Sequence, residues 1–364
     1  MKIGILTYHA CLNYGACLQA YALQRTIMKN ELDCKIIDYQ SYKLIDINHP
    51  FSKVPKHPKE LIKNITRFPY YHQLKKRENL FIDFINNDLF LSKRCANDDD
   101  VVQECEKYDC IVCGSDQIWN LDSSIRYETP LYYMNFEKKQ RRITYATSFG
   151  SWVEKFPLRE RELMPWIKQF DALSMREESG VNMLKSRGVN CEWVLDPTLL
   201  LSKDEYDEIA CSRIIDEPYI LLFSWDGAKE AVDIAKKVAQ QLGYRIYNIV
   251  PPPRAMFCGI DRKLDIGPKQ FLSLIKYAEF VVTNSFHGTV FSIIYQKPFI
   301  SAIKRNADSR RTSLMKQFEL EDHLMNPNNL DLKIINKTDF VKVEENMRPL
   351  KEYSLDYLYK SLNI

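Results

Sequence analysis

The chain has 364 residues, of which 45% are hydrophobic and 27% charged, and its formal net charge is +3. This length allows two domains of ordinary size, and the composition is typical of a globular protein. A balance so near neutrality argues against a partner bound through bulk charge, so we expect no nucleic acid. No run of 18 apolar residues occurs, and the apolar start of the chain is too short for a signal peptide, so we expect a cytoplasmic location.

Strands and helices alternate through the first 200 residues. Residues 2–8 and 34–39 predict strands that flank a helix over 16–28, which is the opening βαβ unit of a Rossmann-like half. The pattern continues with predicted strands over 108–112, 142–146 and 172–175 and predicted helices over 101–107, 160–169 and 177–187. We therefore predict an N-terminal Rossmann-like domain over residues 1–200, with a helical insertion near 51–95.

The second half of the chain repeats this pattern. Its predicted elements are strands over 219–223, 245–250, 280–282 and 298–303 and helices over 229–242 and 268–277. We predict a C-terminal Rossmann-like domain over 201–340 and a helical segment over 341–364 that packs back on the N-terminal domain. The expected fold class is therefore α/β, with two Rossmann-like domains facing a cleft.

The most informative stretch runs from residue 279 to residue 297. An apolar strand leads through Thr283, Asn284 and Ser285 into a helix that opens near Gly288. A strand-to-helix turn of this kind is a common anion-binding place in an open α/β sheet. His287 lies in the turn, where it either exchanges a proton with a ligand or merely caps and packs.

Other predicted strand ends carry polar side chains toward the same edge. Asp116 follows an apolar strand and a glycine, and Arg176 stands at a strand-to-helix junction, where its anion is a substrate or simply Glu177 or Glu178. Gly15 leaves N–H groups exposed at the first helix. The cations that follow the strand over 298–303 are expected to face the rim that carries His287: Lys304, Arg305, Arg310 and Arg311.

The ten cysteines and the acidic run predict neither a disulfide framework nor a metal site. Cys110 and Cys113 have CxxC spacing within a strand, where residues three apart point to opposite faces. The acids at 98–100 precede a short helix and are better explained as capping residues than as metal ligands.

Six motifs, taken in chain order, carry a resemblance. They are Asn13-Tyr14-Gly15, residues 18–23, residues 114–120, residues 174–177, residues 195–198 and the stretch around His287. No single motif is decisive, but the ordered set resembles the polysaccharide pyruvyl transferase family and covers residues 3 to about 320.

This resemblance implies an architecture similar to the glycosyltransferase-B enzymes. It also implies transfer of a pyruvyl group from phosphoenolpyruvate to a sugar of a cell-surface polysaccharide precursor, such as a capsule or an exopolysaccharide, as a cyclic ketal with release of phosphate. The N-terminal domain is then expected on the acceptor side and the C-terminal domain on the donor side. The reaction needs an acid, a base and an anion clamp, so we expect no cofactor.

The same resemblance suggests roles for individual residues. His287 is the expected proton-transfer group near the phosphate, and Asp116 the carboxylate that orients or deprotonates the sugar hydroxyl. The expected substrate-binding residues are Asn13, Tyr14, Gly15, Gln19, Ser115, Gln117, Arg176, Ser285, Gly288, Thr289, Arg305 and Arg310. Family members often have arginine two residues before the histidine, whereas this chain has Ser285 there. Either Arg310 or a neighbour supplies the missing positive charge, or the donor differs.

Two other functions fit the same sequence pattern. A glycosyltransferase that uses a nucleotide sugar needs similar anion-binding turns. A non-catalytic sugar-binding member is the second alternative.

Residues 51–77 form a basic and aromatic segment, with eight basic residues and one acidic residue. Such a segment suits peripheral contact with an anionic membrane or with the diphosphate of a lipid-linked saccharide acceptor, or it is simply a solvated helical face.

Overall fold

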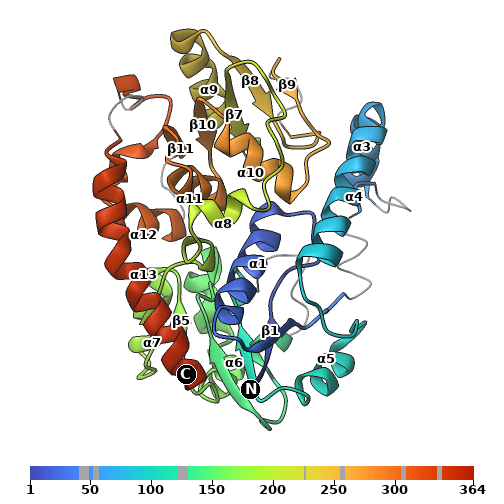
Figure 1. The fold of residues 1–364 in the computed structure, drawn as a ribbon, viewed down its shortest axis with the longest axis vertical. Helices are drawn as coiled ribbons and strands as arrows, with labels where there is room; N and C mark the ends of the chain where they lie inside the picture. The colour runs from blue at the N-terminus through green and yellow to red at the C-terminus, as the bar shows by residue number, and fades with distance from the viewer. Residues whose placement is uncertain are drawn as a thin grey trace.

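The structure is a computed structural model that describes residues 1–40, 49–51, 57–121, 130–224, 227–254, 259–304, 309–333 and 338–364. Two parallel sheets stand at the centre of two α/β units, in the lower and upper halves of Figure 1. The predicted fold class of two Rossmann-like units is confirmed.

The first sheet has four parallel strands in the order β2, β1, β3, β4. They are β1 (Lys2–Leu6), β2 (Asp33–Ile36), β3 (Cys110–Cys113) and β4 (Arg141–Thr144). Two short parallel strands, β5 (Ser174–Met175) and β6 (Glu192–Trp193), follow. Central strands of a parallel sheet are covered on both faces, which is why β3 is a continuous buried apolar run.

The cysteines at the two ends of β3 point to opposite faces, as predicted. Cys110 belongs to one apolar cluster and Cys113 to another, and the Cys113 thiol donates a hydrogen bond to the carbonyl of Tyr132 at 3.0 Å. All cysteines in the described parts of the chain are free.

The second sheet has six strands in the order β12, β11, β10, β7, β8, β9, all paired in parallel. They are β7 (Tyr219–Phe223), β8 (Arg245–Asn248), β9 (Asp261–Arg262), β10 (Phe280–Thr283), β11 (Phe299–Ala302) and β12 (Leu324–Met325). The helices of this unit are α9 (Lys229–Leu242), α10 (Pro268–Lys276), α11 (Phe286–Ile294) and α12 (Ser309–Gln317).

The helices of the first unit are α1 (Tyr14–Met28), α5 (Asp98–Cys105), α6 (Glu160–Ile167) and α7 (Glu178–Lys185). The three acids of the 98–100 run lie in the first turn of α5, where they complement the helix dipole. Helix α1 is buried almost all round, including the polar Gln19 and Gln24. The reason is that α1 packs between the first sheet and the second unit.

The helical stretch between β2 and β3 consists of α3 (Pro58–Arg67), a short 3₁₀ turn η1 (Phe68–Tyr70) and α4 (Tyr71–Asp88). Pro69 lies in η1, where its ring and missing N–H interrupt a continuous helix. Helix α4 buries Phe81 and Phe84, whereas α3 buries no residue at all.

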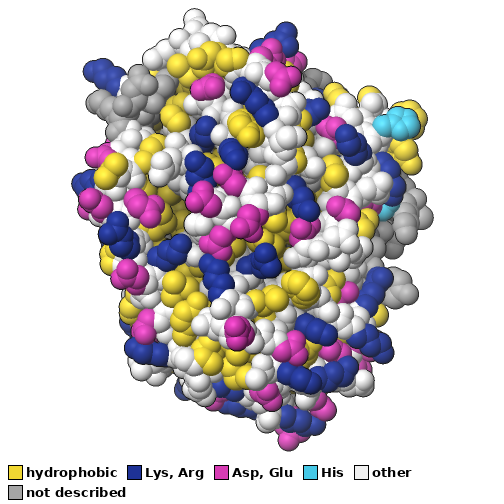
Figure 2. Space-filling view, in the orientation of Figure 1, with side chains coloured by type: hydrophobic (Ala, Val, Ile, Leu, Met, Phe, Trp, Pro, Cys, Tyr) yellow, Lys and Arg dark blue, Asp and Glu magenta, His cyan; other side chains and the backbone are white. Residues whose placement is uncertain are grey.

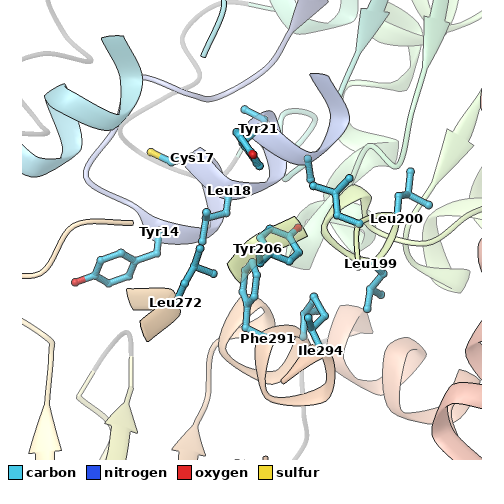
Figure 3. Close-up of a cluster of buried hydrophobic side chains, with 14 of the residues drawn as sticks. Tyr14, Cys17, Leu18, Tyr21, Leu199, Leu200, Tyr206, Leu272, Phe291 and Ile294 are labelled. Carbon is cyan, nitrogen blue, oxygen red and sulfur yellow. The ribbon is translucent and has the colours of Figure 1, made fainter. Parts of the chain in front are cut away.

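One apolar cluster joins the two units, and Figure 3 shows part of it. Tyr14 and Leu18 of α1 meet Leu272 of α10 and Phe291 of α11. Tyr206 also lies there, on the short helix α8 (Lys203–Asp207), with Leu199 of the 3₁₀ turn η4 (Pro197–Leu199).

Helix α13 (Phe340–Leu362) runs along one side of the molecule and ends near the N-terminus (Figure 1). The Leu195 N–H donates to Ser354 at 2.9 Å, and the Tyr357 hydroxyl donates to the Thr144 carbonyl at 3.0 Å. The helix therefore contacts the first unit, while the exact domain boundaries stay a prediction. No helix in the described ranges is long and apolar enough to cross a membrane.

Replacing Phe271 with Ala tests whether the cluster holds the two units together. The Phe271 ring is fully buried, stacks on Tyr14 with centroids 4.5 Å apart, and meets Phe223 and Phe291 edge-on. We expect Phe271→Ala to lower the free energy of unfolding by about 4 kcal/mol in urea titrations followed by circular dichroism, because it leaves a cavity. The matched change Phe90→Ala, at a half-exposed ring, should cost below about 1 kcal/mol. A similar small loss for Phe271→Ala would contradict the prediction.

Candidate active site

The N-termini of two helices, one from each unit, meet at the junction. The side chain of Asn13 caps α1 by accepting from the Gly15 N–H at 3.0 Å, and the side chain of Ser285 caps α11 by accepting from the Gly288 N–H at 3.3 Å. Both caps are residues that favour this position. The predicted strand, turn and helix around His287 are confirmed by β10 and α11.

Gly15 makes a close approach between the two units possible. A methyl group on Gly15 would overlap with the imidazole of His287, and Nδ1 would be the first atom it meets. A glycine is therefore required here for the absence of a side chain. The contact places His287, from the second unit, directly against α1 of the first unit.

Asp116 enters the junction from the end of β3. Gly114 has φ of +132°, and a side chain there would overlap with the carbonyl of Tyr145. Asp116 itself adopts φ of +71°, a left-handed conformation that aspartate tolerates better than most residues. This turn leaves Asp116 only 4% exposed at the carboxyl edge of the sheet.

Arg176 lies between two buried carboxylates. Its guanidinium donates to Oδ1 of Asp116 at 3.0 Å and to Oδ2 of Asp196 at 2.7 Å. It also lies 4.5 Å from the ring centre of Phe286, on α11. Burial lowers the pKa of Arg176, but the surrounding carboxylates Asp116, Asp196 and Glu177 outweigh burial and raise it, so the group stays charged.

Asp196 is the centre of the polar contacts. Its Oδ1 accepts from the Thr198 N–H at 3.0 Å and from the Thr198 hydroxyl at 2.6 Å, and its Oδ2 accepts from the Ser115 hydroxyl at 3.2 Å. Nε2 of His287 lies 3.7 Å from the same Oδ2. Burial alone would raise the pKa of Asp196, but His287, Arg176 and Thr198 together hold it far below its ordinary value.

Two buried side-chain nitrogens at this junction have no hydrogen-bond partner in the described parts of the chain. They are Nε2 of His287 and Nε of Arg176, on side chains that are 7% and 3% exposed. Buried polar groups are nearly always paired, so orphaned ones indicate a place where a ligand binds. We name the group of Asp116, Arg176, Asp196 and His287 the junction cluster.

Gln19 and Ser115 support the cluster from the first unit. The Gln19 amide donates to the Thr7 hydroxyl at 3.0 Å and accepts from the Ser115 N–H at 3.2 Å. Gln117 lies farther along the same turn, where it accepts from Asn120 at 3.0 Å. Their proposed roles in substrate binding stay predictions.

Several other predicted binding residues have structural contacts. Tyr14 is buried in the apolar cluster, and its hydroxyl accepts from Arg77. Thr289 is fully buried and hydrogen-bonds with Ser301 at 3.2 Å, and a side chain on Gly288 would overlap with Thr283. These contacts hold the turn between β10 and α11 in place. That Tyr14, Gly288 and Thr289 touch a substrate stays a prediction.

The predicted cations after β11 have different surroundings. Arg310 lies 5.9 Å from the ring centre of Phe286, next to Ser285, and its charge acts on the buried Glu177. Arg311 is buried and donates to Ser301 at 3.0 Å and to the Ala302 carbonyl at 2.9 Å. Lys304 is exposed, and Arg305 lies outside the described residues.

Asp196 and Glu177 are buried charged residues whose part in the site was not predicted. Both belong to the sequence motifs, at residues 174–177 and 195–198. Glu177 is fully buried, accepts from the Phe149 N–H at 2.8 Å, and has a pKa raised by burial despite the nearby charge of Arg176. Their partners lie 20 to 90 residues away or in the other unit, which no local pattern reveals.

The chain has the two-unit α/β fold of the glycosyltransferase-B type. Staphylococcus aureus MnaA with UDP superposes with a TM-score of 0.54 at 12% identity, covering 100% of this chain and 97% of that one. The Methanocaldococcus jannaschii UDP-GlcNAc 2-epimerase with UDP-GlcNAc and UDP has a TM-score of 0.50 at 13% identity, covering 97% and 100%. The Neisseria meningitidis UDP-GlcNAc 2-epimerase bound to UDP-GlcNAc has a TM-score of 0.50 at 11% identity, covering 100% and 99%. Such identities show a shared fold only.

The sequence profile of the family described as polysaccharide pyruvyl transferase matches residues 13–305, which is well over half of the chain. The chain therefore belongs to this family and is a transferase, as the motifs predicted. No curated protein sequence matches it significantly.

The low pKa of Asp196 predicts a specific pH dependence of stability. Asp196 is ionised in the folded protein at pH values where it would be protonated in the unfolded chain, so its stabilising effect is complete above about pH 5 and is lost as the pH falls below about 4. We expect Asp196→Asn to lower the free energy of unfolding by about 3 kcal/mol at neutral pH, and the difference from wild type to shrink in acid.

Urea titrations of both proteins between neutral and acidic pH measure this effect. The control is Asp83→Asn, at an exposed position on α4, which should change stability by less than about 0.5 kcal/mol at any pH. A stability difference for Asp196→Asn that does not vary with pH would show that the carboxylate charge is not what stabilises the junction.

Proposed function

We propose that this protein transfers a pyruvyl group from phosphoenolpyruvate to two hydroxyls of a sugar in a cell-surface polysaccharide precursor. The products are a cyclic ketal and inorganic phosphate. Family membership supports the proposal, and the observation that carries it is the junction cluster. Arg176 pairs there with the carboxylates of Asp116 and Asp196, the imidazole of His287 from the other unit lies 3.7 Å from Asp196, and two buried nitrogens have no partner among the described residues.

His287 is the proposed acid. Its Nε2 has no hydrogen-bond partner among the described residues and lies 3.7 Å from the Asp196 carboxylate. A protonated His287 can give its proton to the methylene carbon of phosphoenolpyruvate, which makes the adjacent carbon electrophilic. Asp196 is then a positioning residue that holds the imidazolium.

Asp116 is the proposed base for the sugar. Arg176 fixes one of its oxygens at 3.0 Å, and the turn at Gly114 delivers it to the sheet edge. The first sugar hydroxyl attacks the electrophilic carbon and gives its proton to Asp116. The bond from that carbon to the phosphate oxygen then breaks. The second hydroxyl closes the ketal, and its proton leaves with the phosphate. One proton is therefore added to the methylene carbon, and two are released from the sugar hydroxyls.

The charge of the junction cluster limits how the donor binds. Arg176 is already shared by two carboxylates, so the cluster has an excess of negative charge unless His287 is protonated. A donor with a phosphate and a carboxylate therefore needs a further cation. Arg310 supports this role because it lies beside Phe286, next to the position where family members often have arginine and this chain has Ser285.

The chain's own groups supply the acid, the base and the cations of this scheme, so we propose that it needs no cofactor. We also propose that the acceptor is a lipid-linked saccharide and that the reaction takes place in the cytoplasm, at the inner face of the membrane.

A donor assay tests the proposal. The purified full-length protein is incubated with phosphoenolpyruvate and a panel of hexoses and N-acetylhexosamines, free and as glycosides, and phosphate release is followed together with the mass of the product. We expect the pyruvyl adduct of at least one saccharide, and a loss of roughly 10²- to 10⁴-fold in turnover for His287→Ala and for Asp116→Asn.

Two matched variants control for general damage. His72→Ala and Asp83→Asn change exposed residues of the same types on α4 and should keep normal turnover. Near-normal turnover of His287→Ala would remove that residue from the mechanism, and an unchanged rate of Asp116→Asn at saturating sugar would exclude a base at 116.

Replacing Arg310 tests the donor clamp separately. We expect Arg310→Ala to raise KM for phosphoenolpyruvate about tenfold or more, because a charge-assisted contact to the donor is lost, and to lower kcat less. Arg310→Lys should restore part of the affinity. The exposed Arg348 on α13 provides the control Arg348→Ala, and an equal KM for Arg310→Ala and Arg348→Ala would exclude Arg310 from the clamp.

Use of a nucleotide sugar is the second candidate function. The similar structures from S. aureus, M. jannaschii and N. meningitidis contain UDP or UDP-GlcNAc, and the same fold can host either donor. Thermal unfolding with each donor separates them, because only a bound ligand raises the Tm. Stabilisation by UDP-sugars but not by phosphoenolpyruvate would overturn the proposal above.

A further inference from the structure

Helix α3 presents its apolar side to solvent. Leu61, Ile62, Ile65 and Phe68 are 52%, 52%, 63% and 74% exposed. These residues recur at the spacing of one helix face, and α3 with η1 lies at the edge of the molecule (Figure 1). We name these four residues the α3 patch. A contiguous patch of this kind on a helix that buries nothing marks an interaction site.

The polar side of the same helix is turned toward the protein. Nζ of Lys63 donates to the His49 carbonyl at 3.1 Å, and the Arg67 guanidinium donates to the carbonyls of Pro50 and Pro252 at 2.6 and 2.7 Å. The contact to Pro252 reaches the second unit. These hydrogen bonds fix the orientation in which the α3 patch faces outward.

The segment that carries the α3 patch has an excess of basic residues. Residues 57–77 contain six basic residues and one acidic residue, Glu60, which the helical spacing places on the side away from the patch. Lys59 is exposed on the same side of α3 as Glu60, and the exposed Lys75 and Lys76 of α4 pair with Glu78 at 2.6 Å and with Asp265 at 3.0 Å. Figure 2 shows hydrophobic, histidine and basic side chains together at the edge over α3.

We propose that the α3 patch docks onto the surface of an anionic lipid bilayer. An interfacial helix needs an apolar face that enters the boundary between headgroups and acyl chains and a net positive charge that attracts anionic headgroups. Helix α3 has the exposed apolar face, and it carries three basic residues against one acidic residue. A protein interface is depleted of lysine, whereas residues 57–77 contain four lysines. Charge complementarity therefore favours a lipid surface over a protein partner.

The docked helix is connected to the candidate active site. Chain continuity leads from α3 through η1 into α4, where Arg77 donates to the hydroxyl of Tyr14 and to the carbonyl of Leu12 at 3.5 Å. Both acceptors adjoin the N-terminus of α1, which contacts His287. Docking of α3 would therefore hold the junction near the membrane surface. This inference does not depend on the identity of the donor.

Vesicle flotation of the full-length protein tests the proposal. The probes are phosphatidylcholine vesicles with and without phosphatidylglycerol. We expect the wild type to float with the anionic vesicles, less in high salt, and poorly with the neutral ones. The triple variant Leu61→Ser, Ile65→Ser and Phe68→Ser should lose about tenfold or more in partitioning, because three apolar side chains no longer enter the lipid.

A matched variant removes exposed apolar side chains elsewhere. Leu158→Ser with Val341→Ser changes residues that are 83% and 71% exposed, and it should float like the wild type. Circular dichroism should show all variants folded, since none of these side chains is buried. The proposal would be overturned if the wild type did not float or if the triple variant floated equally well. It would also be overturned if the triple variant changed self-association in gel filtration and left flotation unchanged. The donor assay uses soluble acceptors, so its outcome does not depend on whether the protein binds vesicles.

Discussion

The interaction on which the rest of the site depends is the sharing of Arg176 between Asp116 and Asp196. All three side chains are buried, and taking charges out of water is costly unless they are paired and hydrogen-bonded. Here each carboxylate meets the guanidinium at 3.0 Å or less, and Asp196 gains further donors from Ser115 and Thr198. The ends of β3, β5 and β6 are thereby tied to one cation, and the Phe286 ring of the second unit lies against it.

The junction between the two units has an apolar part and a polar part that lie side by side. Its apolar part joins α1 to α10 and α11, and its polar part brings His287 against Gly15. Any movement that separates the units would break both parts, because the same two helices carry them. This explains why α1 is buried on nearly all sides although its polar residues Gln19 and Gln24 would suit a surface helix.

The fold alone does not define the donor. The UDP-GlcNAc 2-epimerases share this two-unit fold, and one fold can host different donors. In the junction cluster, Asp116 and Asp196 share the guanidinium of Arg176. The α3 patch lies outside this site but is linked to it through α4 and Arg77.

The sequence by itself determined the elements and the candidate residues. Buried strands are short apolar runs, and the turns that follow them need Gly114, Asn13 or Ser285, so local chemistry is enough to predict them. Only the tertiary structure decided which groups meet. The sequence left open whether Arg176 faces a substrate or a neighbouring glutamate, and its partners are Asp116, 60 residues away, and Asp196. The spacing of apolar residues over 58–68 predicts a helix with one apolar side, but it does not say which side the protein covers. The structure shows that the apolar side faces solvent, because its residues are exposed and Lys63 and Arg67 on the other side bond to the protein.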